Sequence, residues 1–273
     1  MGELIFVGLG LYDERDLSLR AWEELSRCAT VLVEQYTSRW GSGAVERLSQ
    51  RLGKPVEEIT REELEGERTV LAELTRVSPA PVALLVVGEP FAATTHVALR
   101  LAVEAQGHRW KVVHNASILT AAASLAGLSH YKFGRTVSLP RPREGFRPTS
   151  PYEGLQANWD AGLHTLVLLD LDPAENSYLD AATALRELGA LEEERKGGVL
   201  PPERLVVVVA RAGAPDAAVW AGPRGELQVQ DFGPPLHCVI VPGPTLHFIE
   251  EEALRVLRSP RPPGRPGTLD HPT

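Results

Sequence analysis

Residues 82–107, which read VALLVVGEPFAATTHVALRLAVEAQG, decide the fold class of this chain. The apolar run 82–87 ends at Gly88-Glu89-Pro90, and a helix-length segment follows from Thr94 to Gly107. An apolar run bounded by breakers is typical of a strand that is buried on both faces of a parallel sheet. Open α/β sheets bind ligands at the carboxyl ends of their strands, so the sequence predicts a ligand site at Glu89.

Similar runs on both sides predict two α/β domains in tandem. We expect further strands at 4–7, 29–34, 110–113, 164–169, 205–209 and 237–241. We expect helices from about Ser18, from Glu62, from an N-cap at Asn176, and over 248–257. The segment 219–229, with two internal glycines, predicts an antiparallel hairpin. The predicted domains are 1–121 and 122–258, followed by a proline-rich, disordered tail at 259–273.

Composition narrows the classes of function. The chain has 273 residues and a formal net charge of −8, which argues against nucleic acid as a partner. It shows neither a signal peptide nor an apolar run long enough to cross a membrane, so we expect a cytoplasmic protein with no membrane partner. Cys28 and Cys238 lack the spacing of metal ligands, so we expect buried thiols and no metal site.

The glycines after the first predicted strand, Gly8 and Gly10, allow several interpretations. A dinucleotide-binding fingerprint needs a third glycine where this chain has Asp13. Glu34, at the end of the second strand, is therefore expected to be a solvated strand end rather than a ribose ligand. A tight turn without a ligand, or a turn that lets backbone approach another ligand, remains open.

In its motifs the chain resembles the diphthine synthases. The motifs follow one another in family order between residue 4 and about residue 257. They are GLGLYDE (8–14), GEPFAATTH (88–96), HNASI (114–118), GL (127–128), YKFG (131–134), PTS (148–150), GLHTL (162–166), ARAG (210–213) and PPLH (234–237).

This resemblance implies a fold and an activity. The family belongs to the tetrapyrrole-methylase class of S-adenosylmethionine-dependent methyltransferases, with two α/β domains, the cofactor in the cleft between them, and usually a homodimer. It methylates the amino group of the 3-amino-3-carboxypropyl-histidine of elongation factor 2 in diphthamide biosynthesis, which leaves S-adenosylhomocysteine. Carried over motif by motif, the cofactor contacts are Leu11, Glu89, Ala92, Ser117, Ile118, Leu169, Ala212 and His237. The family usually has Asp where this chain has Glu89.

Several questions stay open at this point. The alternatives are another methyltransferase of the class, acting on a tetrapyrrole or ribosomal RNA, and a nucleotide-binding module without catalysis. We name no catalytic residue, because His96, His114 and His237 near the predicted loops are each expected to be packed or hydrogen-bonded.

A loop rich in arginine and proline provides a hypothesis for recognition of the acceptor. Its arginines are Arg135, Arg141, Arg143 and Arg147. Their charge suits docking of elongation factor 2 or of the acceptor carboxylate.

Overall fold

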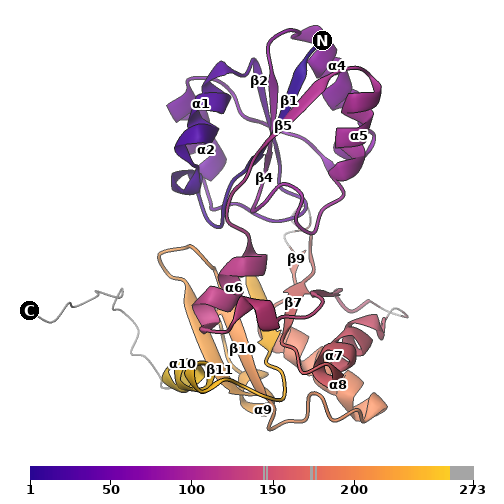
Figure 1. Ribbon diagram of the computed structural model, residues 1–273, viewed down its shortest axis with the longest axis vertical. Coiled ribbons are helices and arrows are strands. Elements are labelled where there is room, and N and C mark those ends of the chain that lie inside the picture. Colours follow the sequence, from indigo (N-terminus) through magenta and orange to yellow (C-terminus); the bar gives the residue numbers. More distant parts are fainter. Residues whose placement is uncertain (144, 146, 173–174, 176, 259–273) are drawn as a thin grey trace, which may run out of the picture. The chain divides into compact units, whose positions relative to one another are not determined.

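The structure, a computed structural model, describes residues 1–258 apart from residues 144, 146, 173, 174 and 176. The chain divides into two compact units (Figure 1). Unit 1 comprises Met1–Ala121 and Leu171–Tyr178, and unit 2 comprises Ala122–Asp170 and the chain from Leu179 onward. Segment Leu171–Tyr178 thus differs from the predicted division, which placed it in the second domain. The predicted tail at 259–273 lies outside the described residues.

Unit 1 is built on a five-stranded parallel sheet in the order β3-β2-β4-β1-β5. The strands are β1 (Glu3–Gly8), β2 (Thr30–Glu34), β3 (Glu57–Glu58), β4 (Val82–Val86) and β5 (Arg109–Val113). β4 pairs with β1 on one side and β2 on the other, and all five of its residues are buried. The prediction of a buried parallel strand at this position is confirmed.

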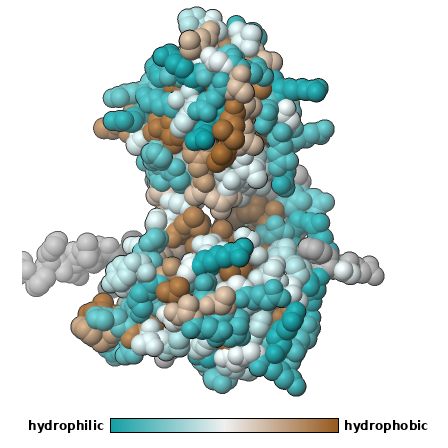
Figure 2. Space-filling view, turned by 45° about the vertical axis from the view of Figure 1, so that its right-hand side comes forward, coloured by the Kyte–Doolittle hydropathy of each residue, from teal (hydrophilic) through white to brown (hydrophobic). Residues whose placement is uncertain are grey.

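Helices cover both faces of this sheet (Figure 1). α1 (Leu19–Arg27) and α2 (Ala44–Leu52) pack on one face with Ile5 and Val7 of β1. α3 (Arg61–Glu65), α4 (Arg68–Arg76) and α5 (Val97–Ala105) pack on the other face with Leu4 and Phe6. α5 keeps Leu101 52% exposed, and Figure 2 shows apolar surface on this side of unit 1.

Side-chain caps set the start of α1 and α3, whereas α5 begins later than expected. Ser18 and Thr60 accept hydrogen bonds from backbone N–H groups of α1 and α3, and Thr60 also forms a capping box with Glu63. α5 begins at Val97 rather than at Thr94. The Thr94 hydroxyl donates to the Pro90 carbonyl instead, which keeps the intervening residues in turns.

Unit 2 contains a mixed five-stranded sheet in the order β11-β10-β12-β7-β6. Its strands are β6 (Val137–Leu139), β7 (Thr165–Leu169), β10 (Leu205–Ala210), β11 (Ala218–Pro223) and β12 (His237–Val241). Its helices are α6 (Ile118–Ala126), which begins in unit 1, α7 (Ser150–Asp160), α8 (Ala181–Arg195), α9 (Arg224–Leu227) and α10 (Phe248–Arg258). The short segments η1 (Glu14–Asp16), η2 (His130–Lys132), β8 (Leu171–Asp172) and β9 (Ser177–Tyr178) complete the described elements.

Two predicted features of the second half are wrong. The N-cap of α8 is Asp180, whose carboxylate accepts the Thr183 N–H at 2.9 Å, whereas Asn176 lies outside the described residues. The segment 219–229 does not form a hairpin, because β11 pairs with β10 and the chain then enters α9. The N–H groups of Arg224 and Gly225 bond to carbonyls of residues 204 and 202, which turns the chain at that point.

Glu250, in the first turn of α10, organises a buried polar network in unit 2. Its side chain is 2% exposed and accepts four hydrogen bonds. The donors are Lys132 Nζ, His164 Nε2 and the backbone N–H groups of Ser129 and His247. His164 Nδ1 accepts the Gly243 N–H at 2.8 Å, so Nε2 carries the proton. Burial raises the pKa of Glu250, but these hydrogen bonds outweigh it and hold the pKa well below its ordinary range.

The two cysteines are free and buried, as expected. Burial raises the pKa of the Cys28 thiol to about 11 and that of Cys238 to about 12. Both therefore act as small apolar side chains at neutral pH.

Candidate functional site

The topology of unit 1 marks one end of its sheet as a candidate site. β1 and β4 are neighbours, and the chain leaves them toward opposite faces: through α1 after β1 and through α5 after β4 (Figure 1). A parallel sheet opens a crevice where neighbouring connections diverge in this way, and ligands bind there. The candidate site is therefore built from the loops that follow β1 and β4.

Glycines let these two loops lie directly against each other. The Gly88 N–H donates to the Gly10 carbonyl at 2.9 Å, and the Leu9 N–H donates to the Val86 carbonyl at the same distance. A Cβ at Gly8 would come within 2.7 Å of the Gly88 carbonyl oxygen, so no larger residue fits there. Gly10 and Gly88 have φ angles of +75° and +79°, in the left-handed region that favours glycine.

The loop after β5 joins the same end of the sheet. Glu89 accepts the Asn115 N–H at 3.0 Å, and a second carboxylate oxygen lies 2.8 Å from His114 Nδ1. Asn115 Nδ2 donates to the carbonyls of Gly8 at 2.9 Å and Asp16 at 3.0 Å. Asn115 thereby contacts all three loops: its side chain joins the loop after β5 to the loop after β1, and its backbone N–H joins it to Glu89 of the loop after β4.

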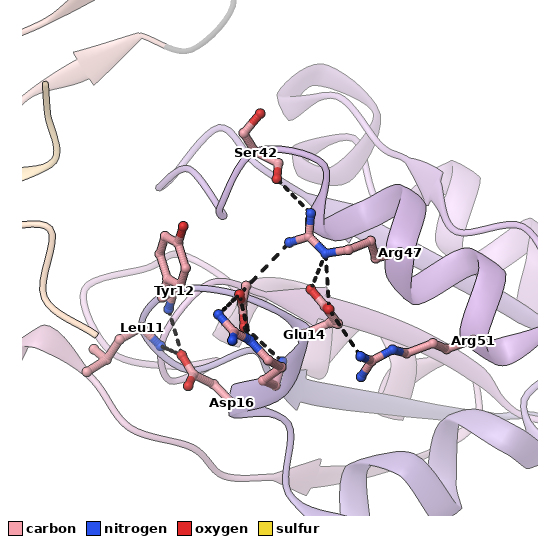
Figure 3. Close-up of polar contacts among 9 residues, drawn as sticks. Leu11, Tyr12, Glu14, Asp16, Ser42, Arg47 and Arg51 are labelled. Carbon is pink, nitrogen blue, oxygen red and sulfur yellow. Dashed lines mark hydrogen bonds and ion pairs between the residues drawn. The ribbon is translucent and has the colours of Figure 1, made fainter. Parts of the chain in front are cut away.

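The segment after Gly10 is held by an acidic network that Figure 3 shows. Glu14 is 2% exposed and pairs with Arg47 of α2 at 3.0 Å and with Arg51 at 3.7 Å. A hydrogen bond from Arg15 lowers the pKa of Asp13 below its ordinary value. Asp16 accepts two backbone N–H groups of the loop. The sequence analysis predicted no role for these carboxylates. Three acidic residues within positions 13–16, directly after a predicted strand and its glycines, could have indicated that this loop is held by hydrogen bonds and ion pairs.

Five of the predicted cofactor residues lie in these three loops or at their ends. Leu11 follows Gly10, Glu89 and Ala92 follow β4, and Ser117 and Ile118 stand where the β5 loop enters α6. All five are partly exposed. The structure thus brings them to the end of the sheet where ligands bind in this class of fold.

The other three predicted residues lie at one edge of the sheet of unit 2. Leu169 ends β7, Ala212 follows β10, and His237 begins β12. Because β12 is antiparallel to both β7 and β10, with Leu168 opposite Cys238 and Ala210 opposite His237, these three positions come together. Their role as cofactor contacts stays a prediction.

His237 is held as a neutral, packed side chain. Its Nδ1 accepts the Ala181 N–H at 3.3 Å, so the proton is on Nε2, which lies 3.1 Å from the Pro234 carbonyl. Burial and the nearby charge of Arg211 lower the pKa of His237. Both ring nitrogens are engaged within unit 2.

Glu34 is not a solvated strand end, and that expectation is wrong. Its side chain is fully buried, and burial raises its pKa. It accepts the Thr37 N–H at 3.1 Å, and His96 Nε2 lies 3.9 Å away. His96 is 2% exposed, and its Nδ1 lies 2.9 Å from the Pro90 carbonyl, so the loop after β4 covers the end of β2.

The arginine-rich loop divides into two kinds of side chain. Arg141 is 14% exposed and pairs with Asp170 at 3.3 Å, and Arg147 pairs with Glu187 at 3.6 Å. Arg135 and Arg143 are exposed. The ion pairs of Arg141 and Arg147 brace the loop, so Arg135 and Arg143 are better placed to meet an acceptor.

The part of the chain that the structure describes contains neither a metal-binding cluster nor a membrane-spanning helix. Within it, no group of three or more His, Cys, Asp or Glu side chains is arranged to hold a metal ion. Within the same residues, no helix combines the length and apolar character needed to cross a membrane.

Comparisons with known proteins agree on one family. Residues 3–228 match the family model of the tetrapyrrole (corrin/porphyrin) methylases. The chain is 40% identical over 251 residues to the diphthine synthase of Methanothermobacter thermautotrophicus, covering 92% of this chain and 94% of that protein. It is 37% identical over 254 residues to the diphthine synthase of Methanosphaera stadtmanae, covering 93% and 95% of the two chains. A crystal structure of a diphthine synthase superposes with a TM-score of 0.83 at 35% identity, covering 94% of this chain and 96% of that one.

Proposed function

This chain belongs to the tetrapyrrole methylases and, within them, to the diphthine synthases, and from that membership we propose its substrates. It transfers methyl groups from S-adenosylmethionine to the amino group of the 3-amino-3-carboxypropyl-histidine of elongation factor 2. The observation that carries this proposal is the junction of three loops at the divergence of β1 and β4, where glycines let the first two loops lie against each other. The match to the tetrapyrrole methylase family model runs from residue 3 to residue 228 and so includes all three loops.

The groups present in these loops fit S-adenosylmethionine. The Glu89 carboxylate suits the hydroxyl or ammonium groups of the cofactor, and its side chain is 20% exposed. Leu11 and Ile118 present partly exposed apolar side chains that suit the adenine ring and the methionine chain. Ser117 adds a hydroxyl that accepts the Leu119 N–H at 3.2 Å and has a proton to donate.

When bound, the cofactor supplies an electrophilic methyl group on a sulfonium. The acceptor amine forms the new N–C bond, the C–S bond breaks, and its electron pair stays on sulfur to leave S-adenosylhomocysteine. The protein contributes by holding the amine in line with the methyl group, an effect worth about 7–11 kcal/mol in favourable cases. Apolar side chains at the site keep water from the uncharged nucleophile.

The amine loses its proton to solvent in this proposal. His96 is 2% exposed, and both ring nitrogens of His237 are engaged. The Nδ1 atom of His114 lies against Glu89. These contacts support a reaction without a dedicated histidine base.

The proposal extends to unit 2, to the assembly and to recognition of the acceptor. Leu169, Ala212 and His237 contribute cofactor contacts from unit 2, which their common sheet edge supports. The chain acts in the cytoplasm as a homodimer, and Arg135 and Arg143 assist docking of elongation factor 2.

The deciding experiment measures transfer of labelled methyl groups to elongation factor 2 that carries the precursor histidine. Calorimetry with S-adenosylmethionine and with NAD accompanies it, and Glu89→Ala serves as the impaired variant. We expect label in the factor, binding of S-adenosylmethionine and not of NAD, and weaker cofactor binding by the variant. Cofactor binding without label would point to a tetrapyrrole or ribosomal RNA substrate. Absence of cofactor binding would reject the methyltransferase assignment.

A further inference from the structure

We propose that Asp16 is a positioning residue for the cofactor. Its carboxylate fixes the two peptide groups that flank Leu11, and the loop then presents the Leu11 carbonyl to the ligand. This inference rests on the proposed function, because Leu11 is one of the predicted cofactor contacts. It assigns to Asp16 an indirect role that acts through the backbone of its neighbours.

The contacts of Asp16 define the orientation of both peptide groups (Figure 3). One carboxylate oxygen, Oδ2, accepts the N–H of Leu11 at 3.1 Å and the N–H of Tyr12 at 2.7 Å. The Tyr12 N–H and the Leu11 carbonyl belong to the same planar trans peptide, so they point in opposite directions. The Leu11 carbonyl is therefore aimed away from Asp16.

The other flanking peptide is fixed at both of its polar atoms. This peptide joins Gly10 to Leu11. Its N–H belongs to Leu11 and donates to Asp16, and its carbonyl belongs to Gly10. The Gly10 carbonyl accepts the Gly88 N–H at 2.9 Å. The residue that carries the predicted contact is thus locked between the β4 loop and Asp16.

Asp16 itself is held from several directions. Its carbonyl accepts Asn115 Nδ2 at 3.0 Å, and its N–H donates to the Asp13 carbonyl at 3.0 Å. A Cβ at Gly10 would lie 2.7 Å from the Asp16 Cβ, so the absence of a side chain at Gly10 makes room for Asp16. These contacts hold the Asp16 carboxylate where it meets the two N–H groups.

Because both N–H groups share one oxygen, the role needs an oxygen atom and not a negative charge. Asp16→Asn keeps a carbonyl oxygen that can occupy the Oδ2 position, whereas Asp16→Ala removes every acceptor. We expect the dissociation constant for S-adenosylhomocysteine to rise at least about tenfold in Asp16→Ala and to stay within about twofold in Asp16→Asn. The KM for S-adenosylmethionine rises in Asp16→Ala with little change in kcat, because the lost contact stabilises the bound substrate and the transition state equally.

The test is calorimetry of the full chain with S-adenosylhomocysteine, with urea unfolding of each variant. Thr60→Ala is the matched control, because it also removes a side-chain oxygen that accepts a backbone N–H. The Thr60 hydroxyl accepts the Glu63 N–H at 3.2 Å, at the start of α3, which follows the edge strand β3. We expect Thr60→Ala to lose stability and to keep its affinity. If Asp16→Ala is too unstable to titrate, the isosteric Asp16→Leu replaces it.

The outcomes separate the two proposals. If the wild-type chain binds the product and Asp16→Ala binds it equally well, the positioning role is overturned and the methyltransferase assignment stands. If Asp16→Asn is as impaired as Asp16→Ala, the role of the oxygen is overturned. If the wild-type chain binds neither S-adenosylhomocysteine nor S-adenosylmethionine, the proposed function fails and this inference fails with it.

Discussion

At the scale of single residues, the lack of a side chain at Gly10 leaves room for the side chain of Asp16. Its φ angle of +75° disfavours any side chain, and an added Cβ would also meet the Asp16 Cβ at 2.7 Å. Gly53 shares the positive φ angle, at +65°, but an added Cβ there would meet nothing within 4 Å. The pair separates conformational strain from steric conflict.

We predict different costs for alanine at these two positions. Gly53→Ala should lower the free energy of unfolding by about 1 kcal/mol, the cost of the left-handed conformation alone. Gly10→Ala should lower it by about 2–4 kcal/mol, because overpacking adds to strain. Urea denaturation of both variants measures the difference. Equal losses would show that Asp16 moves aside without cost.

Glu250 provides a prediction for unit 2 and for its dependence on pH. Its four partners are all donors, and an amide has only one oxygen, so Glu250→Gln leaves at least one donor facing an NH₂ group. We expect a loss of about 2–4 kcal/mol of unfolding free energy at neutral pH. Glu252→Gln on the same helix, an exposed partner of Arg255, should change stability little.

The effect of Glu250 should fade in acid. Because the folded pKa of Glu250 is depressed, its ionised form stabilises the protein fully above the unfolded pKa of about 4.3. That contribution is lost as the pH falls below this value toward the folded pKa. The gap between wild type and Glu250→Gln should therefore be constant from about pH 7 to 5 and narrow below about pH 4. A gap that widens in acid would contradict the assignment.

The sequence predicted where the strands end but not what covers each end. Gly8, Gly88 and Glu89 follow apolar runs, and parallel strands place such ends together. The burial of Glu34 was missed, because nothing next to it in sequence shows that His96 packs over it. Its partner is 62 positions away along the chain, and only the folded arrangement brings the two together.

At the scale of elements, Asn115 connects the loops after β1, β4 and β5. Its Nδ2 faces two carbonyl oxygens, and its Oδ1 accepts the Ala116 N–H at 2.8 Å, so the amide cannot turn over without losing these bonds. The substitution Asn115→Asp would place a carboxylate oxygen against both carbonyls. The loops should then separate while the strands stay paired.

We predict that Asn115→Asp lowers the free energy of unfolding by about 1–3 kcal/mol and speeds amide exchange in the loop after β1. The matched control is Asn158→Asp in unit 2, where Nδ2 donates to the Arg135 carbonyl at 2.8 Å and to the Thr165 hydroxyl at 2.9 Å. The control should lose comparable stability without faster exchange at Leu11 or Tyr12. Hydrogen exchange followed by mass spectrometry reads out both variants.

The predicted elements succeeded where burial leaves a local pattern. β4 was found because a strand covered on both faces is apolar at every position. The hairpin at 219–229 failed because its first half is β11 but its second half is α9. The bonds that turn the chain there come from residues 202 and 204, which a local pattern cannot include.

At the scale of the whole molecule, the predicted cofactor residues come from both units. We expect S-adenosylhomocysteine to slow amide exchange in two groups of segments: residues 9–12, 88–93 and 115–118 in unit 1, and the chain near Leu169, Ala212 and His237 in unit 2. Exchange in α4 should stay unchanged and serves as an internal control. Protection confined to unit 1 would remove the three unit 2 residues from the site.

The count of strands and helices favoured two α/β domains, and two units are what the chain forms. Which residues belong to each unit was only partly predictable, because segment Leu171–Tyr178 joins unit 1 through contacts with residues that are distant in the sequence. One such contact joins Arg39 to the Tyr178 hydroxyl at 2.8 Å. No periodicity in the sequence of residues 171–178 indicates a partner near residue 39.

This return of the chain has a consequence for biosynthesis. Unit 1 takes its last piece from residues that are translated after β6, α7 and β7 of unit 2. A nascent chain on the ribosome can therefore pair all five strands of the first sheet before segment Leu171–Tyr178, the last part of unit 1, has been synthesised. Unit 1 can complete its folding only once residue 178 has left the ribosome. Folding of the two units therefore overlaps in time and is not strictly sequential.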